Sequence, residues 1–329
     1  MILIVIYIRS KKSVYILLGY TMIHPSVAEI TGDRWQKGQE SVTMGADILY
    51  STITDAITNK KGALIGRHGT IELSMILIMT QMNKIDWVKA STLQMNAGVF
   101  PKEETSIRKW FHEYVQATMA ADCMAAGWYT PLARAELTYL SQIAPNAKLI
   151  PLRSIEPYYC TSDHHWTTAL AGHRVTVVSS FVESMREQLE FKEVVWGDKH
   201  ESLLPSNTQW SFVRSYYSPA LAQGKCEWPA PIQSWSDAVE TMEKEVLDTK
   251  PRIVLLGCGG LAMPLAGRLK QKGIICVVMG GAIQLLFGMK GRRWESHPQI
   301  SQMFTDDWIL PSPSEIPNGA AQVEGGCYW

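Results

Sequence analysis

The sequence predicts an α/β fold, a Rossmann-like and mostly parallel sheet flanked by helices. Residues 253–256 and 274–279 are continuously apolar, which is the pattern of strands buried on both faces. A glycine-rich turn and a helical stretch separate these two segments. A strand, helix and strand of this length form a crossover whose two strands are parallel.

Composition excludes several classes of protein. The chain has 329 residues, of which 46% are hydrophobic and 19% charged, so it can bury a large core and is neither disordered nor a small disulfide scaffold. Its 31 lysines and arginines balance 31 aspartates and glutamates. Without a basic surplus, nucleic acid is not an expected partner, and any bound anion must be held by a local cluster of cations.

The first 24 residues differ from the rest. Residues 1–8 are wholly apolar and residues 14–18 nearly so, with cations between them. Neither run has the roughly 20 apolar residues of a membrane-spanning helix, and a signal peptide carries its positive charge before its apolar stretch. No membrane span is therefore predicted. We interpret residues 1–24 either as a β-rich leader or as the product of a mis-assigned start, with Met22 the true beginning, and residues 25–329 as one domain.

The cysteines predict a reducing environment. The six cysteines lie far apart, with no C-x-x-C pair and no zinc-finger spacing to histidine, so a structural zinc site is not expected. Cys258 and Cys276 fall in apolar segments, where a thiol acts as a small hydrophobic group. We therefore expect reduced thiols and a cytoplasmic location.

The first half of the chain predicts a strand followed by two helices. Residues 63–66 form a short apolar strand, and Thr70 is the expected N-cap of a helix that carries apolar residues to Met79. Apolar residues then recur at three- and four-residue steps through residues 105–126, and Gly127 follows them. This whole segment is predicted to be one amphipathic helix.

The middle of the chain predicts a strand and a helix with a local cap. Residues 174–178 have the pattern of a strand, after which Ser180 and Glu183 form a capping box for a helix that reaches Leu189. Residues 201–231, rich in serine, proline and aromatic residues, predict long loops.

The last predicted helices flank the crossover. Ser234 and Asp237 form a second capping box, at the start of the helix before residues 253–256. Pro264 suits the first position of the crossover helix, which ends at Gly273, because an N–H is unsatisfied there in any case.

A glycine turn follows the strand at residues 253–256. Gly257, Gly259 and Ala262 fit the G-x-G-x-x-A dinucleotide fingerprint, and Gly260 lies within it. The following strand ends in Met279, Gly280 and Gly281, where NAD-binding proteins have an acidic ribose ligand. The turn is therefore interpreted either as a phosphate-binding loop or as a turn that lets a helix pack close to its strand.

A basic cluster stands out in this neutral chain. Lys290, Arg292, Arg293 and Trp294 follow the uncharged stretch of residues 273–289. Arginine presents a rigid fork to phosphate oxygens and tryptophan a stacking face, so the cluster predicts diphosphate binding. The alternative is a solvated charge run on an exposed turn.

A polar motif lies at the end of the strand at residues 63–66. Arg67, His68, Gly69, Thr70 and Glu72 stand at a strand's carboxyl end, where ligands bind in open α/β sheets. Glu72 is interpreted as a metal ligand, a sugar hydroxyl acceptor or a base, and Arg67 as a phosphate partner. A structural alternative is a carboxylate stabilised by the dipole at the start of a helix.

Aromatic and acidic residues gather near the middle of the chain. Glu156, Tyr158, Tyr159, His165 and Trp166 lie within one short segment. Aromatic faces beside carboxylates suit sugar rings, and Glu156 or a histidine can deprotonate a hydroxyl. The same residue types also occur in ordinary loops and at the edge of a core.

The order of these motifs resembles the GT-D-fold glycosyltransferases of bacterial polysaccharide gene clusters and some large DNA viruses. Residues 67–73 resemble the family's R-x-G-[S/T/D]-x-E-[L/V] signature. Similar blocks continue to the end of the chain, and the resemblance covers about residues 62–329 in order. The blocks are Leu152 and Arg153 with residues 156–159, Trp166 with residues 175–178, residues 257–260 with Pro264, residues 280–282 with Gln284 and Gly288, residues 290–294, and residues 324–329.

The resemblance implies a catalytic domain that moves a sugar from a nucleotide-diphosphate donor, with a UDP-sugar favoured, to a hydroxyl of a glycan acceptor. It implies Glu72 as the first candidate for the base and Glu156 as the second. The donor-binding set that it implies is Arg67, His68, Gly69, Thr70, Gly257, Gly259, Gly260, Gly281, Lys290, Arg292, Arg293 and Trp294. The acceptor set is Tyr158, Tyr159, His165 and Trp166.

One departure from the family concerns the metal. Better-known members carry Asp-x-Glu around a divalent cation, whereas this chain has Thr70 and Glu72. Mn²⁺ or Mg²⁺ at Glu72 and metal-independent transfer are therefore equal expectations, because one carboxylate makes a poor site for either ion. In the second case Arg67 or the Lys290 cluster neutralises charge on the leaving diphosphate. The alternative functions are a nucleotide- or NAD-binding oxidoreductase and a non-catalytic binding protein of the same fold.

Overall fold

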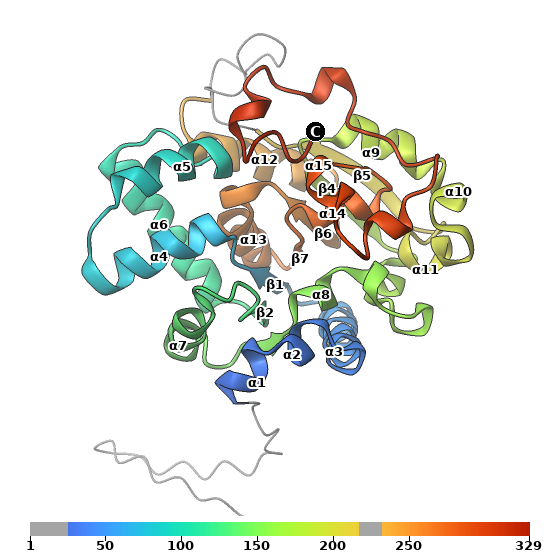
Figure 1. Ribbon diagram of the computed structural model, residues 1–329, viewed down its shortest axis with the longest axis horizontal. Helices are drawn as coiled ribbons and strands as arrows, with labels where there is room; N and C mark the ends of the chain where they lie inside the picture. Colours follow the sequence, from blue (N-terminus) through green and yellow to red (C-terminus); the bar gives the residue numbers. More distant parts are fainter. Residues whose placement is uncertain (1–25, 217–231) are drawn as a thin grey trace, which may run out of the picture.

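The pairing of strands confirms the predicted α/β class. The computed structural model (Figure 1) describes residues 26–216 and 232–329, so the predicted leader lies outside the described residues. Its seven strands form one parallel sheet in the order β3-β2-β1-β7-β6-β4-β5. The strands are β1 (Ala63–Arg67), β2 (Cys123–Ala125), β3 (Lys148–Ile150), β4 (Arg174–Ser179), β5 (Gln209–Arg214), β6 (Ile253–Gly257) and β7 (Ile275–Val278).

Alternate residues of the central strands enter two different core layers. In β6, Val254 and Leu256 belong to one hydrophobic cluster, and Ile253 and Leu255 belong to the other. All four side chains are fully buried. This confirms the prediction, made from continuous apolarity, that the strand is covered on both faces.

Helices cover both faces of the sheet. One layer contains α4 (Thr70–Met82), α5 (Trp87–Ala97), α6 (Glu104–Met119), α7 (Ala133–Ile143), α12 (Trp235–Asp248) and α13 (Ala262–Gln271). The other contains α3 (Gln39–Thr58), α8 (Leu152–Ile155), α9 (Val182–Leu189) and α14 (Ala282–Leu286). The remaining α-helices are α1 (Val27–Thr31), α2 (Asp33–Lys37), α10 (Lys192–Trp196), α11 (His200–Leu203) and α15 (Arg292–Glu295). Figure 1 shows the C-terminal segment returning to the sheet beside α14 and α15.

Two features of the described residues concern membrane-spanning helices and cysteines. None of their helices is both long and apolar enough to cross a membrane. Cys123, Cys160, Cys258, Cys276 and Cys327 form no disulfide.

The prediction of a single helix through residues 105–126 is wrong at its end. Helix α6 stops at Met119, and residues Cys123–Ala125 form β2. Asp122 explains the change, because its carboxylate accepts a hydrogen bond from the backbone N–H of Leu64 at 2.7 Å and from Lys270 Nζ at 2.6 Å. The chain is thereby held beside β1, where the buried segment pairs as a strand.

Three local predictions also need correction. Gly69 is the N-cap of α4 and Thr70 is its first residue, because the backbone of Gly69 is already extended there. Pro264 is the third residue of α13, still within the turn whose N–H groups lack helical partners. The stretch predicted as loops contains β5, and its residues 217–231 lie outside the described part of the chain.

The two predicted capping boxes have different outcomes. Ser234 caps α12 as expected, with Oγ accepting from the N–H of Asp237 at 3.2 Å. The box at α9 is wrong, because Ser180 bonds Ser215 instead at 2.7 Å. The free N–H groups of α9 are taken by the buried carboxylate of Glu315, which accepts from Glu183 N at 2.8 Å and from Ser184 N at 3.2 Å.

Replacement of the distant cap should destabilise the fold more than replacement of the local acid. We expect Glu315→Ala to lower the free energy of unfolding by about 2 kcal/mol, because two buried N–H donors lose their acceptor. Glu183→Ala removes an exposed side chain that pairs with Arg186, so it is the matched control and should change the free energy of unfolding by less than about 0.5 kcal/mol. Urea unfolding measures both, and equal effects would contradict this account of α9.

Candidate functional site

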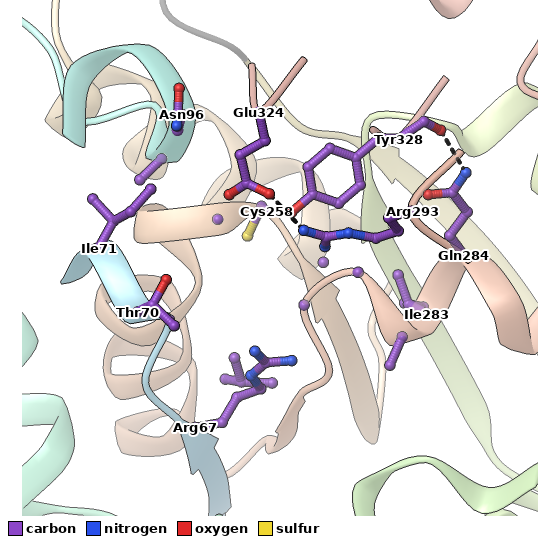
Figure 2. Close-up of a pocket in the computed structure, with 18 of the residues that line it drawn as sticks. Arg67, Thr70, Ile71, Asn96, Cys258, Ile283, Gln284, Arg293, Glu324 and Tyr328 are labelled. Atoms are coloured by element: carbon purple, nitrogen blue, oxygen red, sulfur yellow. Dashed lines mark hydrogen bonds and ion pairs between the residues drawn. The ribbon is translucent and has the colours of Figure 1, made fainter. Parts of the chain in front are cut away.

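A large cavity lies at the carboxyl edge of the sheet. Its volume is about 810 Å³, and residues that follow all seven strands line it. Ligands in open α/β folds bind at this edge, and the size suits a nucleotide. Figure 2 shows side chains from β1, the end of α5, α14 and the C-terminal segment entering it.

Arg67 is fixed on the floor of the cavity between the first and last strands. Its Nη1 donates to the carbonyl oxygen of Met279 at 3.2 Å, and its guanidinium lies 5.1 Å from the ring centroid of Trp128. Gly280 has a φ of +60°, and a Cβ there would lie 3.0 Å from Arg67 Nη1. Glycine is therefore required by both the backbone conformation and the space that the guanidinium fills.

Arg293 reaches the same glycine pair from α15. A Cβ at Gly281 would lie 3.5 Å from Arg293 Nη1. The guanidinium pairs with Glu324 at 2.5 Å and lies 4.4 Å from the ring centroid of Tyr328 (Figure 2). Gly280 and Gly281 are thus flanked by two guanidinium groups whose residues are far apart in the sequence.

Glu72 is folded back over the start of its own helix. A Cβ at Gly69 would lie only 2.1 Å from Glu72 Oε2, so the glycine of the Arg67 motif makes room for this carboxylate. Glu72 is 7% exposed. Burial raises its pKa, against the opposing effects of a hydrogen bond from its own backbone N–H and of the charge of Arg67.

Glu156 is the second carboxyl group of the cavity. Burial raises its pKa to about 7, although Arg67 and Arg153 act in the opposite direction. Arg153 itself lies 4.4 Å from the ring centroid of Tyr159, which also lines the cavity. A carboxyl group with such a pKa can exchange a proton near neutral pH.

The structure brings most of the predicted site residues to this cavity. Those that line it are Arg67, Gly69, Thr70, Glu72, Glu156, Tyr159, Gly257, Gly259, Gly281, Arg293 and Trp294. Those that do not are His68, Gly260, Tyr158, His165, Trp166, Lys290 and Arg292.

His68 is a buried residue between Arg67 and Gly69, both of which line the cavity. It is fully buried, and its Nδ1 lies 2.8 Å from Oε1 of Glu136. The other oxygen of Glu136 accepts from the N–H of Gly127 at 2.8 Å. This buried pair therefore joins the segments that follow β1 and β2.

The predicted acceptor residues divide between the cavity and the core. Tyr158 stacks on Trp196 with ring centroids 5.9 Å apart. His165 bonds Ser202 at 2.7 Å, and the indole N–H of Trp166 donates to the carbonyl of Ile155 at 3.1 Å. These buried contacts leave Tyr159 as the member of the set that lines the cavity.

The basic cluster is split by the turn that carries it. Arg293 lines the cavity, whereas Arg292 does not and Lys290 Nζ lies 5.8 Å from the ring centroid of Phe304. Consecutive residues of a helical turn point in different directions, so a run of charges cannot act as one site.

The glycine fingerprint has the features of a packing turn. Gly259 has a φ of +55°, and a Cβ there would lie 3.1 Å from the carbonyl oxygen of Ala97. A Cβ at Gly260 would lie 2.9 Å from Val99. These glycines let the end of α5 approach the turn after β6, although Gly257 and Gly259 also line the cavity.

Several cavity residues lie outside the set predicted from sequence. Trp128 follows β2, so the failure to recognise that strand also hid its side chain. Gln284, Glu324 and Tyr328 line the cavity from α14 and the C-terminal segment. A carboxyl-edge rule applied to a correctly placed β2 would have found Trp128. The positions of the other three depend on tertiary packing.

The residues around Glu72 do not fit a protein-bound divalent cation. The described part of the chain has no group of three or more histidine, cysteine, aspartate or glutamate side chains able to hold a metal. Thr70, two positions before Glu72, offers a hydroxyl group rather than a second carboxylate. Glu72 is also turned against Gly69 with its protonated form favoured by burial, which is a poor arrangement for Mg²⁺ or Mn²⁺.

Comparisons with known proteins add little to this description. No protein-family model and no curated protein matches the chain. Among solved structures, it is similar to a selenomethionine-substituted domain of unknown function 1792, with 14% identity and a TM-score of 0.38 over 74% of this chain and 82% of that chain. A similarity of this size carries no argument about function.

Ionisation of Glu156 should make the fold less stable at alkaline pH. Its pKa is about 7 in the folded chain against an ordinary value of 4.5, so the folded state favours the protonated form. That contribution is fully present below about pH 4.5 and is lost as the pH rises through 7. Glu156→Gln cannot ionise, so the variant should gain stability over the parent protein between about pH 5 and pH 8. Urea unfolding across this range measures it, and parallel curves would contradict the burial of the charge.

Proposed function

We propose that this chain transfers a sugar from a nucleoside diphosphate donor, with a UDP-sugar favoured, to a hydroxyl of a glycan acceptor. The observation that carries the proposal is the content of one cavity, where two guanidinium groups flank Gly280 and Gly281 and the carboxyl groups of buried Glu72 and half-buried Glu156 also line the wall. A diphosphate needs the cations, and activation of a hydroxyl needs a proton acceptor.

The two guanidinium groups supply charge to the leaving group. When the bond between the anomeric carbon and the diphosphate oxygen breaks, negative charge accumulates on that oxygen. Arg67 and Arg293 present fixed forks of N–H donors in a partly enclosed site, where such stabilisation is strongest. Arg67 is already oriented by Met279 and Trp128, so little reorganisation is needed.

Glu156 is the residue we assign as the base. The acceptor oxygen forms a bond to the anomeric carbon, and the hydroxyl proton passes to the carboxylate of Glu156. The raised pKa of about 7 makes this carboxylate a stronger proton acceptor than an exposed one. Glu72 is more enclosed and is turned toward Gly69, so we assign it to a contact with the donor sugar.

Charge neutralisation by arginine replaces a metal in this proposal. No step is routed through a cation, because the residues around Glu72 do not provide one with a site. Turnover in the presence of EDTA is therefore expected to persist.

The rival functions make different demands on the cavity. An NAD-linked oxidoreductase of the dinucleotide-binding type needs an acidic ribose ligand at the end of β7. At that position the carbonyl oxygen of Met279 instead accepts a hydrogen bond from the guanidinium of Arg67. A non-catalytic binding protein would bind the donor and leave it intact.

Binding of nucleoside diphosphates should depend on the two cavity arginines. We expect Arg67→Ala and Arg293→Ala each to weaken UDP binding by about tenfold or more, because each loses a charge-assisted hydrogen bond to phosphate. Arg292→Ala is the matched control, because Arg292 neighbours Arg293 in the sequence but does not line the cavity. Isothermal titration calorimetry with UDP, GDP and NAD, with and without Mn²⁺, measures these effects. Tight binding of NAD alone would refute the proposed function.

Loss of the base should slow transfer without abolishing donor binding. Glu156→Gln is expected to reduce kcat by about 10²- to 10⁴-fold while the Kd for UDP stays within about threefold. In the parent protein the rate should fall as the pH drops below about 7, where Glu156 becomes protonated. Release or transfer of sugar from the matching donor measures both. A pH profile that is unchanged in Glu156→Gln would assign the proton transfer to another group.

A further inference from the structure

Gln284 presents an unused hydrogen-bond acceptor on the cavity wall. The residue belongs to α14, is 1% exposed and lines the cavity. Its amide nitrogen donates to the carbonyl oxygens of Lys290 and Tyr328, both at 2.8 Å. Because these two partners only accept hydrogen bonds, they fix which end of the amide carries the nitrogen.

The oxygen at the other end of the amide has no partner within residues 26–216 and 232–329. Figure 2 shows it on the side away from the bond to Tyr328 O, facing the side chains of Tyr328 and Arg293. Buried polar atoms are paired in the great majority of folded proteins. An orphaned acceptor that is locked in orientation at a cavity wall therefore indicates a ligand that donates a hydrogen bond there.

The sheet order places Glu72, which follows β1, and Gln284, whose helix lies over β6, on opposite sides of the turn after β7 that carries Gly280 and Gly281. Along the edge, Glu156 follows β3 and Glu72 follows β1, whereas the two glycines follow β7. Helix α14 lies beyond them, over β6, where Ile283 contacts Gly257. A donor whose diphosphate lies at Gly280 and Gly281 therefore has its two ends near chemically different walls.

The wall beside Gln284 suits a nucleobase better than the reacting sugar. Transfer needs a proton acceptor, which an amide oxygen is not at neutral pH, and Glu324, the carboxylate on this side, is already paired with Arg293. Tyr328 and Trp329 line this side, and Phe181 meets Trp329 edge to face with ring centroids 6.1 Å apart. Aromatic rings with one directional polar contact are what a planar heterocycle requires.

We propose that Gln284 Oε1 accepts a hydrogen bond from a ring N–H of the donor's nucleobase and so selects the nucleotide. The inference rests on the proposed function, because it assumes that a nucleoside diphosphate occupies the cavity. Uracil and guanine carry a ring N–H next to a carbonyl group, whereas cytosine and adenine have an unprotonated ring nitrogen at the corresponding position. Donors built on UDP or GDP are favoured, and those built on CDP or ADP are rejected by two facing acceptors.

The first test leaves the protein unchanged and alters the ligand. Isothermal titration calorimetry compares UDP, GDP, CDP, ADP and pyrophosphate with 3-methyl-UDP, in which a methyl group replaces the ring hydrogen. UDP or GDP should bind about tenfold or more tightly than CDP, ADP and 3-methyl-UDP. Equal binding of UDP, CDP and 3-methyl-UDP would overturn the inference and leave the proposed function standing. If neither pyrophosphate nor any nucleotide binds, the proposed function fails and the inference fails with it.

The second test alters the acceptor. Gln284→Met should reduce the preference for UDP or GDP over CDP to less than about threefold while pyrophosphate binds as before. Gln271→Met, at an exposed position at the end of α13, is the control and should keep the full preference. A variant that binds pyrophosphate and retains the parent's preference would overturn the role of Gln284. The methylated ligand gives the answer even if Gln284→Met does not fold.

Discussion

The pairing of β1 with β7 is the constraint on which the candidate site depends. Residues of β1 lie in register with β7, from Ala63 opposite Ile275 to Ile65 opposite Val277, so the first and last strands of the chain end side by side. Arg67 can therefore donate to Met279, 212 positions away. The glycines that follow β7 then leave space for the guanidinium. A shift of this register would separate the charge from the turn that it serves.

Burial and charge oppose each other within the cavity, and burial prevails at both carboxyl groups. Arg67 favours the ionised forms of Glu72 and Glu156, yet the pKa of each is raised, because loss of solvent is the larger effect. The same enclosure strengthens the field of a guanidinium on a phosphate, since that interaction is less screened there. One shielded cavity thus suits both the basic carboxylate and the diphosphate-binding cations of the proposed function.

Sequence alone predicts those features that local pattern determines. Strands β1, β6 and β7 are continuously buried and were predicted, whereas β2 and β3 have three residues each and β5 is half-exposed, so none has a clear apolar signature. The Arg67 motif was placed correctly at a strand end. Two other features depend on tertiary packing and cannot be predicted from local spacing. They are the cap that Glu315 supplies to Glu183, 132 positions away, and the separation of Arg293 from Arg292.

The end of the chain is part of the candidate site because its backbone positions side chains that line the cavity. The carbonyl of Tyr328 orients Gln284, and the carbonyl of Cys327 accepts from the N–H of Arg293 at 3.1 Å. Glu324 already neutralises Arg293, so a diphosphate in the proposed complex exchanges one anionic partner for another on this guanidinium. Replacing a carboxylate by a phosphate changes the net charge around Arg293 less than adding a phosphate to an unpaired guanidinium would. The binding free energy at Arg293 is therefore set by the difference between phosphate and carboxylate as partners, whereas at Arg67 a phosphate is compared with the neutral carbonyl oxygen of Met279.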